Sequence, residues 1–369
     1  MAKSTVPTET RLLSNLVFHA RPFWAAMGNL ESGILRDELD RIAIDRPIYV
    51  AGLARSGTTI LLELLAAHER TASHTYRDFP MLYTPFWWNW FLKTASGGRP
   101  DRRPLEERTH KDGIQVGPES PEAMEEPLWM HYFSGLHDPA RCNVLDARDR
   151  NRDFDRFYSN HIRKILLVRR AQRYLAKGNY NLSRIRYLAR LFPDARFVVP
   201  VREPLMHIAS LRKQQRLFEK LETEDPAVLT HMCRVGHFEF GLNRVPVNHG
   251  RHETSERIVA LWNAGQDVEA WAWYWDDVHR HLLELLDDPQ LKESILVVDY
   301  DALCSDSAAW VDAIFGHCRL EPDRRLVEEY AQKLNPPAYY QHGFSREEIR
   351  TIAGRTQETA EQLGIRLGA

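Results

Sequence analysis

The sequence predicts an α/β fold in which a central parallel sheet is flanked by helices. Three short apolar runs typical of buried strands, at residues 48–53, 195–201 and 295–300, are each followed by a stretch with the apolar spacing of a helix. Apolar runs that alternate with helices favour a parallel sheet covered on both faces. The 369 residues are 43% hydrophobic and 27% charged, which is typical of a globular protein with a packed core.

The segments outside these strand and helix units fall into three groups. Residues 8–45 carry apolar side chains at helical spacing, so we expect one or two leading helices within residues 1–46. Two long insertions, at about 79–150 and 214–270, separate the strand and helix units. The sequence has no internal repeat and no Ser/Gly linker, so we expect one domain over residues 1–369, with long helical and loop insertions.

Charge, cysteine spacing and hydropathy exclude several classes of protein. The 49 basic and 51 acidic residues leave a net charge of −2, so we expect no nucleic acid partner. Cys142, Cys233, Cys304 and Cys318 are widely spaced, which predicts neither a disulfide framework nor a zinc site, and we expect no metal. The sequence has no signal peptide pattern and no run of 18 uncharged apolar residues, so we expect a cytoplasmic protein without a membrane span.

The first strand is followed by a glycine-containing loop that resembles a phosphate-binding motif. Residues 52–59, Gly-Leu-Ala-Arg-Ser-Gly-Thr-Thr, have the glycine spacing of a nucleotide P-loop, but Thr58 replaces the usual lysine. Backbone N–H groups can still hold a phosphate at the start of the helix. The missing lysine argues against a triphosphate and favours a single 5′-phosphate, with Arg55 as the positive group in the loop. The alternative is that this loop only caps the helix and binds no phosphate.

A second candidate anion site follows the strand at 195–201. Arg202 is expected at the carboxyl edge of the sheet, where open α/β folds bind ligands. Ser210 lies about two helical turns further along, so its hydroxyl could share an anion with the guanidinium. Two separate anion sites suit a nucleotide that is phosphorylated at two positions. The sequence therefore predicts a fold like that of P-loop nucleotide-binding proteins, and a bound nucleotide that carries phosphate at two separate positions.

Together these segments resemble the sulfotransferases that use 3′-phosphoadenosine 5′-phosphosulfate (PAPS), in a bacterial-type branch. The matching blocks are ArgSerGlyThrThr at 55–59, the segment at 176–204, VREPLMHIASL from residue 201 and ILVVDYDAL from residue 295. The resemblance implies PAPS as co-substrate and places Tyr300 near the adenine. The cofactor contacts it implies are Arg55, Ser56, Gly57, Thr58, Thr59, Arg202, Ser210 and Tyr300.

The resemblance also implies catalytic roles. Lys177 and Arg55 would neutralise charge on the sulfuryl oxygens and on the leaving phosphate. Cytosolic sulfotransferases have a histidine two residues after this lysine, but here Asn179 stands at that place, and an amide cannot accept a proton. Other branches have a carboxylate after the second strand, and here Asp78 occupies that place. We therefore predict Asp78 as the general base. The alternative is that its carboxylate pairs with Arg77 or caps the next turn.

A second candidate base lies in the first insertion. His110 is the runner-up, followed by the acidic residues Glu119, Glu122, Glu125 and Glu126. The glutamates also suit the first turn of a helix, where negative charge is favourable.

The two insertions are expected on the acceptor side. Residues 79–91 are rich in aromatics, which either belong to the core or form the wall of a pocket for a small molecule, lipid or glycan with a hydroxyl or amine. Residues 237–248 could form a lid, and peripheral membrane contact stays open. Two alternatives remain: a P-loop kinase or nucleoside triphosphatase with Asp299 as a magnesium ligand, and a non-catalytic nucleotide-binding relative. The sequence does not predict the oligomeric state.

Overall fold

The computed structural model describes residues 8–97, 104–111, 113–334 and 342–366. Five strands form a parallel sheet in the order β2-β5-β1-β6-β7, which confirms the predicted fold class. These strands are β1 (Ile48–Ala51), β2 (Thr71–Ala72), β5 (Arg173–Gly178), β6 (Arg196–Val201) and β7 (Ile295–Asp299). A separate antiparallel hairpin consists of β3 (Glu106–Glu107) and β4 (Gln115–Val116).

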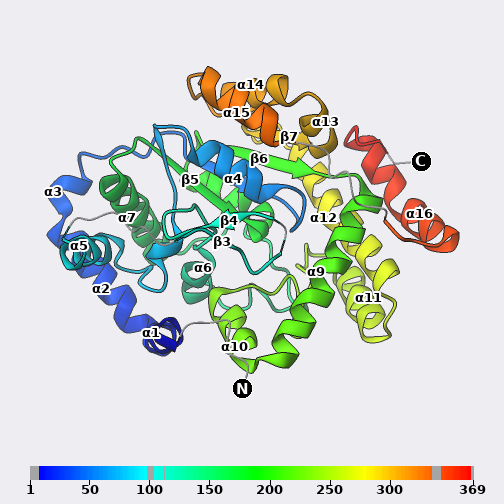
Figure 1. Cartoon of the computed structure of the whole chain (residues 1–369), viewed down its shortest axis with the longest axis horizontal. Helices are drawn as coiled ribbons and strands as arrows, with labels where there is room; N and C mark the ends of the chain where they lie inside the picture. Colours follow the sequence, from blue (N-terminus) through cyan, green and yellow to red (C-terminus); the bar gives the residue numbers. More distant parts are fainter. Residues whose placement is uncertain (1–7, 98–103, 112, 335–341, 367–369) are drawn as a thin grey trace.

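The helices surround this sheet (Figure 1). Those before β5 are α1 (Thr8–His19), α2 (Arg21–Ile34), α3 (Arg36–Leu39), α4 (Thr58–Ala66), α5 (Pro85–Ala95), α6 (Glu126–Tyr132) and α7 (Arg152–Arg169). Those between β5 and β7 are α8 (Ile185–Leu191), α9 (Pro204–Glu224), α10 (Pro226–Val235), α11 (His252–Asn263) and α12 (Asp267–Leu286). The last four are α13 (Tyr300–Ser305), α14 (Ser307–His317), α15 (Arg324–Lys333) and α16 (Arg346–Gln362). Short 3-10 turns are η1 (Tyr76–Asp78), η2 (Asn179–Arg184) and η3 (Lys292–Ser294).

The central strand β1 is buried on both faces, as its unbroken apolar sequence predicts. Alternate side chains of a strand point to opposite faces, so Ile48 and Val50 join the core under α4, α14 and α15. Tyr49 and Ala51 join the larger core formed with α7, α8, α9 and α12. Figure 1 shows α14 and α15 on one side of the sheet and α9 and α12 on the other. The two cores hold the carboxyl ends of β1, β5 and β6 at one edge.

The leading segment forms three helices, where the sequence predicted one or two. Helix α2 is fixed to α7 by an ion pair between Glu31 and Lys164 at 2.8 Å, and both side chains are fully buried. The same ammonium donates to the carbonyl of Gly28 at 3.0 Å. Gly28 has no room for a side chain, because a Cβ would lie 2.4 Å from the carbonyl oxygen of Tyr83. Burial raises the pKa of Glu31 and lowers the pKa of Lys164.

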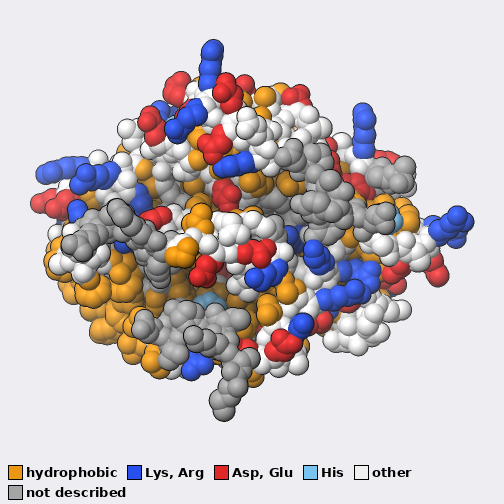
Figure 2. All heavy atoms as spheres, viewed as in Figure 1, with side chains coloured by type: hydrophobic (Ala, Val, Ile, Leu, Met, Phe, Trp, Pro, Cys, Tyr) orange, Lys and Arg blue, Asp and Glu red, His pale blue; other side chains and the backbone are white. Residues whose placement is uncertain are grey.

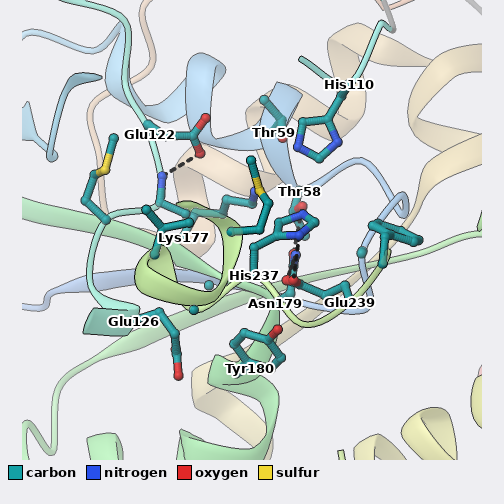
Figure 3. A pocket seen from close by; sticks show the side chains of 18 of the residues that line it. Thr58, Thr59, His110, Glu122, Glu126, Lys177, Asn179, Tyr180, His237 and Glu239 are labelled. Atoms are coloured by element: carbon teal, nitrogen blue, oxygen red, sulfur yellow. Dashed lines mark hydrogen bonds and ion pairs between the residues drawn. The ribbon is translucent and has the colours of Figure 1, made fainter. Parts of the chain in front are cut away.

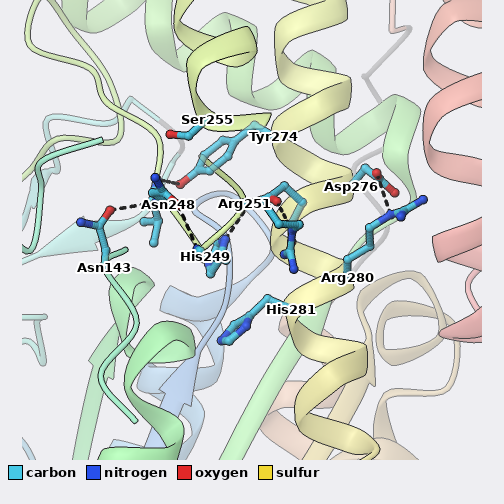
Figure 4. A network of polar contacts seen from close by, with 12 residues as sticks. Asn143, Asn248, His249, Arg251, Ser255, Tyr274, Asp276, Arg280 and His281 are labelled. Carbon is cyan, nitrogen blue, oxygen red and sulfur yellow. Dashed lines mark hydrogen bonds and ion pairs between the residues drawn. The ribbon is translucent and has the colours of Figure 1, made fainter. Parts of the chain in front are cut away.

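The second insertion is held on α12 by a network of polar contacts (Figure 4). His249 Nδ1 lies 2.7 Å from Asp277 Oδ2, and Arg251 Nε donates to Asp277 Oδ1 at 2.5 Å. Burial opposes the charge on Asp277, but the contacts with His249 and Arg251 lower the pKa of this carboxyl. The backbone N–H of Val247 donates to the Tyr274 hydroxyl at 3.2 Å. The loop before α11 is therefore fixed relative to the sheet.

One predicted strand ends earlier than expected. Strand β7 stops at Asp299, and Tyr300 is the first residue of α13. The Asp299 carboxylate accepts from the backbone N–H groups of Asp301 and Ala302, at 2.9 and 3.1 Å, and so caps the helix. None of the described helices is both long enough and apolar enough to cross a membrane.

Candidate functional site

The loop between β1 and α4 has the backbone shape of a phosphate cradle. Gly57 caps α4 at a φ of 107°, in the left-handed region, and Arg55 has a φ of 72°. A Cβ on Gly57 would lie 2.4 Å from the Tyr300 ring, so only glycine fits between the loop and this ring. The backbone N–H groups at the start of α4 are not needed within the helix and can point at an anion.

Helix α9 holds this loop in place. His207 Nε2 donates to the carbonyl of Ala54 at 2.8 Å, and the Trp275 indole donates to His207 Nδ1 at 3.2 Å. Because an indole can only donate, Nδ1 accepts and the imidazole is neutral. Burial agrees with this, since it lowers the pKa of His207 well below its ordinary value. Arg55 Nε donates to the Ser210 hydroxyl at 3.3 Å, which joins the loop to α9 a second time.

Arg202 follows β6 directly, at the carboxyl edge of the sheet as predicted. Its side chain is 6% exposed, yet Nε and Nη2 have no hydrogen-bond partner among the described residues. Its guanidinium carbon lies 5.6 Å from the centre of the Tyr300 ring. Buried N–H groups that lack a hydrogen-bond acceptor are costly, so the Nε and Nη2 positions of Arg202 suit an anionic ligand. The Ser56 hydroxyl is also buried without a partner among the described residues.

A cavity of about 400 Å³ opens beside the loop (Figure 3). Residues from four parts of the chain meet in it: the loop and α4, the first insertion, the end of β5 and the second insertion. Its polar lining includes Arg55, Thr58, Thr59, Tyr76, Arg108, His110, Glu122, Lys177, Asn179, His231, His237 and Glu239. Its apolar lining includes Phe79, Met124, Phe218, Met232, Val235 and Phe240. The cavity therefore combines charged groups at the sheet edge with an apolar wall.

Lys177 enters the cavity from the end of β5. The parallel register pairs it with Val50, so it lies one strand away from the loop that follows β1. Among the described residues, its ammonium has no hydrogen bond and no ion pair. Burial lowers the pKa of Lys177, the nearby charge of Glu122 raises it, and Arg108 and Arg55 lower it further. Lys177 is thus an unpaired cation beside the predicted phosphate loop.

Two histidines face the cavity from the two insertions. The rings of His110 and His237 have their centres 5.6 Å apart, and Figure 3 shows both near Lys177. His110 Nδ1 is buried without a hydrogen-bond partner among the described residues. Burial, assisted by the charges of Arg108 and other cations, lowers the pKa of His110 well below its ordinary value. The lowered pKa keeps the His110 imidazole unprotonated, and the same shift makes it a weaker proton acceptor than an ordinary histidine.

The cavity also holds two carboxylates that already accept hydrogen bonds. Glu122 accepts from the Tyr76 hydroxyl at 2.5 Å and from the backbone N–H of Ala123 at 2.6 Å. Glu239 accepts from Asn179 Nδ2 at 2.7 Å, and the same amide accepts from the Thr58 hydroxyl at 3.5 Å. Asn179 therefore connects the start of α4 with the second insertion.

Asp78 is not among the residues that line this cavity, although its neighbours Tyr76 and Phe79 are, and its role as general base stays a prediction. It is fully buried and forms a capping box with Thr75 at the start of η1, the alternative that the sequence left open. Its carboxylate also accepts from Arg169 Nη2 at 2.7 Å and from Asn89 at 3.0 Å. Burial opposes its charge, but His74 and Arg169 outweigh burial and hold the pKa of Asp78 far below its ordinary value. A carboxylate bound in this way is a structural anchor and a weak base.

The other acidic candidates are engaged in ion pairs or hydrogen bonds. Glu119 pairs with Arg77 near the surface. Glu125 accepts from the hydroxyls of Tyr158 and Tyr174, at 2.6 and 2.5 Å.

Glu126 forms a double hydrogen bond with Arg184 and contacts His137. Despite burial, these partners lower the pKa of Glu126 to about 2. It begins α6, as predicted for a glutamate in a first helical turn.

Sequence reasoning did not single out several cavity residues, among them Arg108, His237 and Glu239. Arg108 is 7% exposed and donates from Nη1 to the Thr59 hydroxyl at 3.1 Å. His237 and Glu239 lie in the segment expected to form a lid, but neither was singled out. The pattern His-x-Glu immediately after a helix-ending Gly236 is the one signal that could have pointed to them.

The segment 339–348, which precedes and begins α16, is only partly described, since residues 339–341 lie outside the described residues. In its described part, Phe344 packs under Arg212, whose guanidinium carbon lies 5.3 Å from the ring centre. Within the described residues, no group of three or more potential side-chain ligands could hold a metal ion.

The parallel sheet, its glycine-containing loop and the anion-suited edge define a P-loop-like α/β protein. A family model described as the sulfotransferase family matches residues 47–234, and the chain belongs to this family. The match spans β1 to α10 and contains both candidate anion sites. No curated protein sequence matches the chain.

Two solved structures share the fold. One is the sulfotransferase STF1 from Mycobacterium tuberculosis, with 16% identity and a TM-score of 0.51, over 96% of this chain and 88% of that one. The other is the sulfotransferase STF9 from Mycobacterium avium, with 13% identity and a TM-score of 0.53, over 91% of this chain and 82% of that one. At these identities the likeness concerns the fold, including the parallel sheet and its flanking helices.

Proposed function

We propose that this protein transfers the sulfuryl group of PAPS to a hydroxyl or amine of an acceptor bound in the cavity. The observation that carries the proposal is the buried Arg202 guanidinium, which has unpaired N–H groups close to a phosphate loop without a lysine. Two anion positions of this kind suit a nucleotide with a 5′-phosphosulfate and a separate 3′-phosphate. A triphosphate would leave Arg202 without a partner.

The chain has groups suited to both ends of this donor. The 5′ end would bind the backbone of Arg55, Ser56 and Gly57 and the hydroxyls of Thr58 and Thr59 at the start of α4. The 3′-phosphate would bind Arg202 and Ser210. Tyr300 packs on Gly57 and near Arg202, so its ring can bound the adenine side. Burial raises the pKa of Tyr300 to about 12, so this hydroxyl stays protonated.

Sulfuryl transfer forms a bond between sulfur and the acceptor and breaks the bond between sulfur and the 5′-phosphate oxygen. Negative charge then increases on the leaving phosphate. Lys177 and Arg55 are the cations beside that position, and they act best when held in place before the reaction. Lys177, free of protein partners among the described residues, has its ammonium available for this contact.

We assign the general base to His110, in place of Asp78. The acceptor must lose a proton as it attacks, and the base must be close to it and unprotonated. His110 meets the second condition because its imidazole is neutral, and its buried Nδ1 has no partner among the described residues. Glu122 and Glu239 are weaker candidates, since hydrogen bonds from Tyr76 and Asn179 already stabilise their charge.

The experiment that tests the proposed function is PAPS turnover against a panel of phenols, alcohols, amines, glycans and lipids. The expected product is a sulfated acceptor, detected by mass spectrometry, together with one equivalent of 3′-phosphoadenosine 5′-phosphate. Lys177→Met is the matched variant that should lose turnover. Phosphorylation of an acceptor by ATP with magnesium would favour the kinase alternative. That alternative is already weakened, because Asp299 caps α13.

A further inference from the structure

Large apolar side chains are exposed on three neighbouring helices. Of the ten large hydrophobic residues found exposed, eight lie on α1, α2 and α5 and are 39 to 65% exposed. We call them the apolar face: Leu12, Leu13, Leu16, Phe23, Leu30, Ile34, Trp90 and Phe91. Figure 2 shows hydrophobic atoms gathered at the lower left of the molecule, over the place of these helices in Figure 1. Exposed apolar surface concentrated in this way marks an interaction site.

The inner sides of these helices are already occupied. Helix α1 turns Val17 inward, and α2 turns Ala25 and Gly28 inward. Helix α5 is joined to α2 through the backbone N–H of Trp87, which donates to the Glu31 carboxylate at 2.6 Å. The apolar face therefore lies on the outer sides of helices whose inner sides already pack against the protein core.

Basic residues outnumber acidic ones on these helices, which also carry Glu9 near the start of α1. In residues 11–34 and 85–95, the cationic side chains are Arg11, Arg21 and Lys93. The one acidic residue in the same ranges is Glu31, which is fully buried against Lys164. Arg11 and Lys93 are exposed, and Arg21 is half-buried over the Phe18 ring. Cations beside an aromatic and leucine-rich helical surface suit the interface of an anionic bilayer. A second copy on the same face would bring like charges together.

Helix α1 also lies beside a recess that shares a lining residue with the acceptor cavity. A shallow recess beside α1 is lined by Phe18, Arg21, Arg234 and Phe79. Phe79 lines the main cavity as well, and its ring packs edge-on against His231 with the centres 5.4 Å apart. The recess and the cavity are therefore neighbours, although none of the eight residues of the apolar face lines either one.

We propose that the apolar face docks this protein on anionic lipid bilayers. Leu16 and Phe23 enter the boundary between headgroups and acyl chains, and Arg11, Arg21 and Lys93 contact the anionic headgroups. The docking does not depend on sulfuryl transfer, because it can be measured without donor or acceptor. Failure of the proposed function would therefore leave this inference standing, and the reverse also holds.

The test is cosedimentation of the full chain with phosphatidylcholine vesicles, with and without about one third phosphatidylglycerol. We expect binding to the anionic vesicles at least about tenfold tighter than to the neutral ones, with loss of binding at high salt. The double variant Leu16→Glu, Phe23→Glu should bind at least about tenfold more weakly. Leu242→Glu is the matched control, since Leu242 is 53% exposed but lies outside the apolar face, and it should bind as the wild type does.

Three outcomes would overturn the proposal. The first is absence of binding to anionic vesicles by the wild-type chain. The second is equal binding by the wild type and the double variant, with circular dichroism showing that both are folded. The third is a concentration-dependent dimer that the double variant abolishes, without vesicle binding, because the face would then be an interface between two copies.

Discussion

Arg55 in the phosphate loop donates from Nε to the hydroxyl of Ser210 on α9, at 3.3 Å. This contact joins the loop that follows β1 to the helix that follows β6, and so links the two candidate anion sites. Ser210 is buried, and its hydroxyl can accept from Arg55 while donating to a phosphate. The two ends of one nucleotide would therefore be held by a connected set of groups.

Arg202→Ala should separate the two anion sites in a binding experiment. Removing a charged hydrogen-bonding partner costs about 1.5–3 kcal/mol, which is roughly a tenfold to hundredfold loss of affinity. We expect this loss for 3′-phosphoadenosine 5′-phosphate and a much smaller one for 5′-AMP, measured by calorimetry. Equal losses for the two nucleotides would contradict a 3′-phosphate role for Arg202.

Lys177→Met should reduce kcat with little change in nucleotide affinity. The ammonium is expected to act on charge that develops during transfer, and removing one preorganised group of this kind costs about 10²–10³ in kcat. Methionine keeps most of the volume of the side chain. Single-turnover measurements with radiolabelled PAPS would check the prediction, and an unchanged rate would exclude the proposed contact.

His110→Asn should abolish most turnover and remove a pH dependence. General base catalysis contributes about 10²–10⁴-fold. Because burial lowers the pKa of His110, the imidazole stays neutral through pH 6.5, and the acid limb of kcat/KM should lie below that value. The matched comparison is Glu122→Gln, which we expect to be less damaging. A larger loss in Glu122→Gln than in His110→Asn would transfer the assignment to Glu122.

Asp78→Asn should affect stability more than chemistry. The native carboxylate accepts from Thr75, Asn89 and Arg169, and an amide cannot accept from all of them. We expect a loss of about 1–3 kcal/mol in the free energy of unfolding at pH 7.

The pH dependence of this loss has a defined sign. The folded pKa of Asp78 is lowered, so its contribution is present above the unfolded value of about 3.9 and is lost as pH falls through the folded pKa. Denaturant unfolding of wild type and Asp78→Asn at several pH values should show curves that converge only below about pH 4. A constant difference down to lower pH would contradict this account. Loss of turnover in a variant that keeps its stability would restore Asp78 as the base.

The fold class was predictable because local patterns determine it, and the candidate anion sites, which stay predictions, depend on the same patterns. The apolar run at 48–53, the glycines at 52 and 57 and the amphipathic helix after them lie within a few residues of one another. The same holds for the strand and helix unit around Arg202. The resemblance of segment 176–204 pointed to Lys177, whereas the pairing of β5 with β1 is seen only in the structure.

The catalytic assignments depended on contacts between distant segments, which no local pattern encodes. Asp78 turns inward because Arg169, 91 residues later, and Asn89 bind its carboxylate. His110 and His237 meet because the two insertions pack against each other at the sheet edge. The sequence therefore indicated which segments form the site but not the direction of their side chains.

The measurement that tests the central claim most directly is competition between nucleotides for the protein. Calorimetric titration with 3′-phosphoadenosine 5′-phosphate, and then with ATP and magnesium, needs no knowledge of the acceptor. We expect the bisphosphate to bind at least about tenfold more tightly than ATP, since each charged contact of Arg202 contributes about 1.5–3 kcal/mol. Tighter binding of ATP with magnesium would contradict the assignment of a PAPS site to this protein.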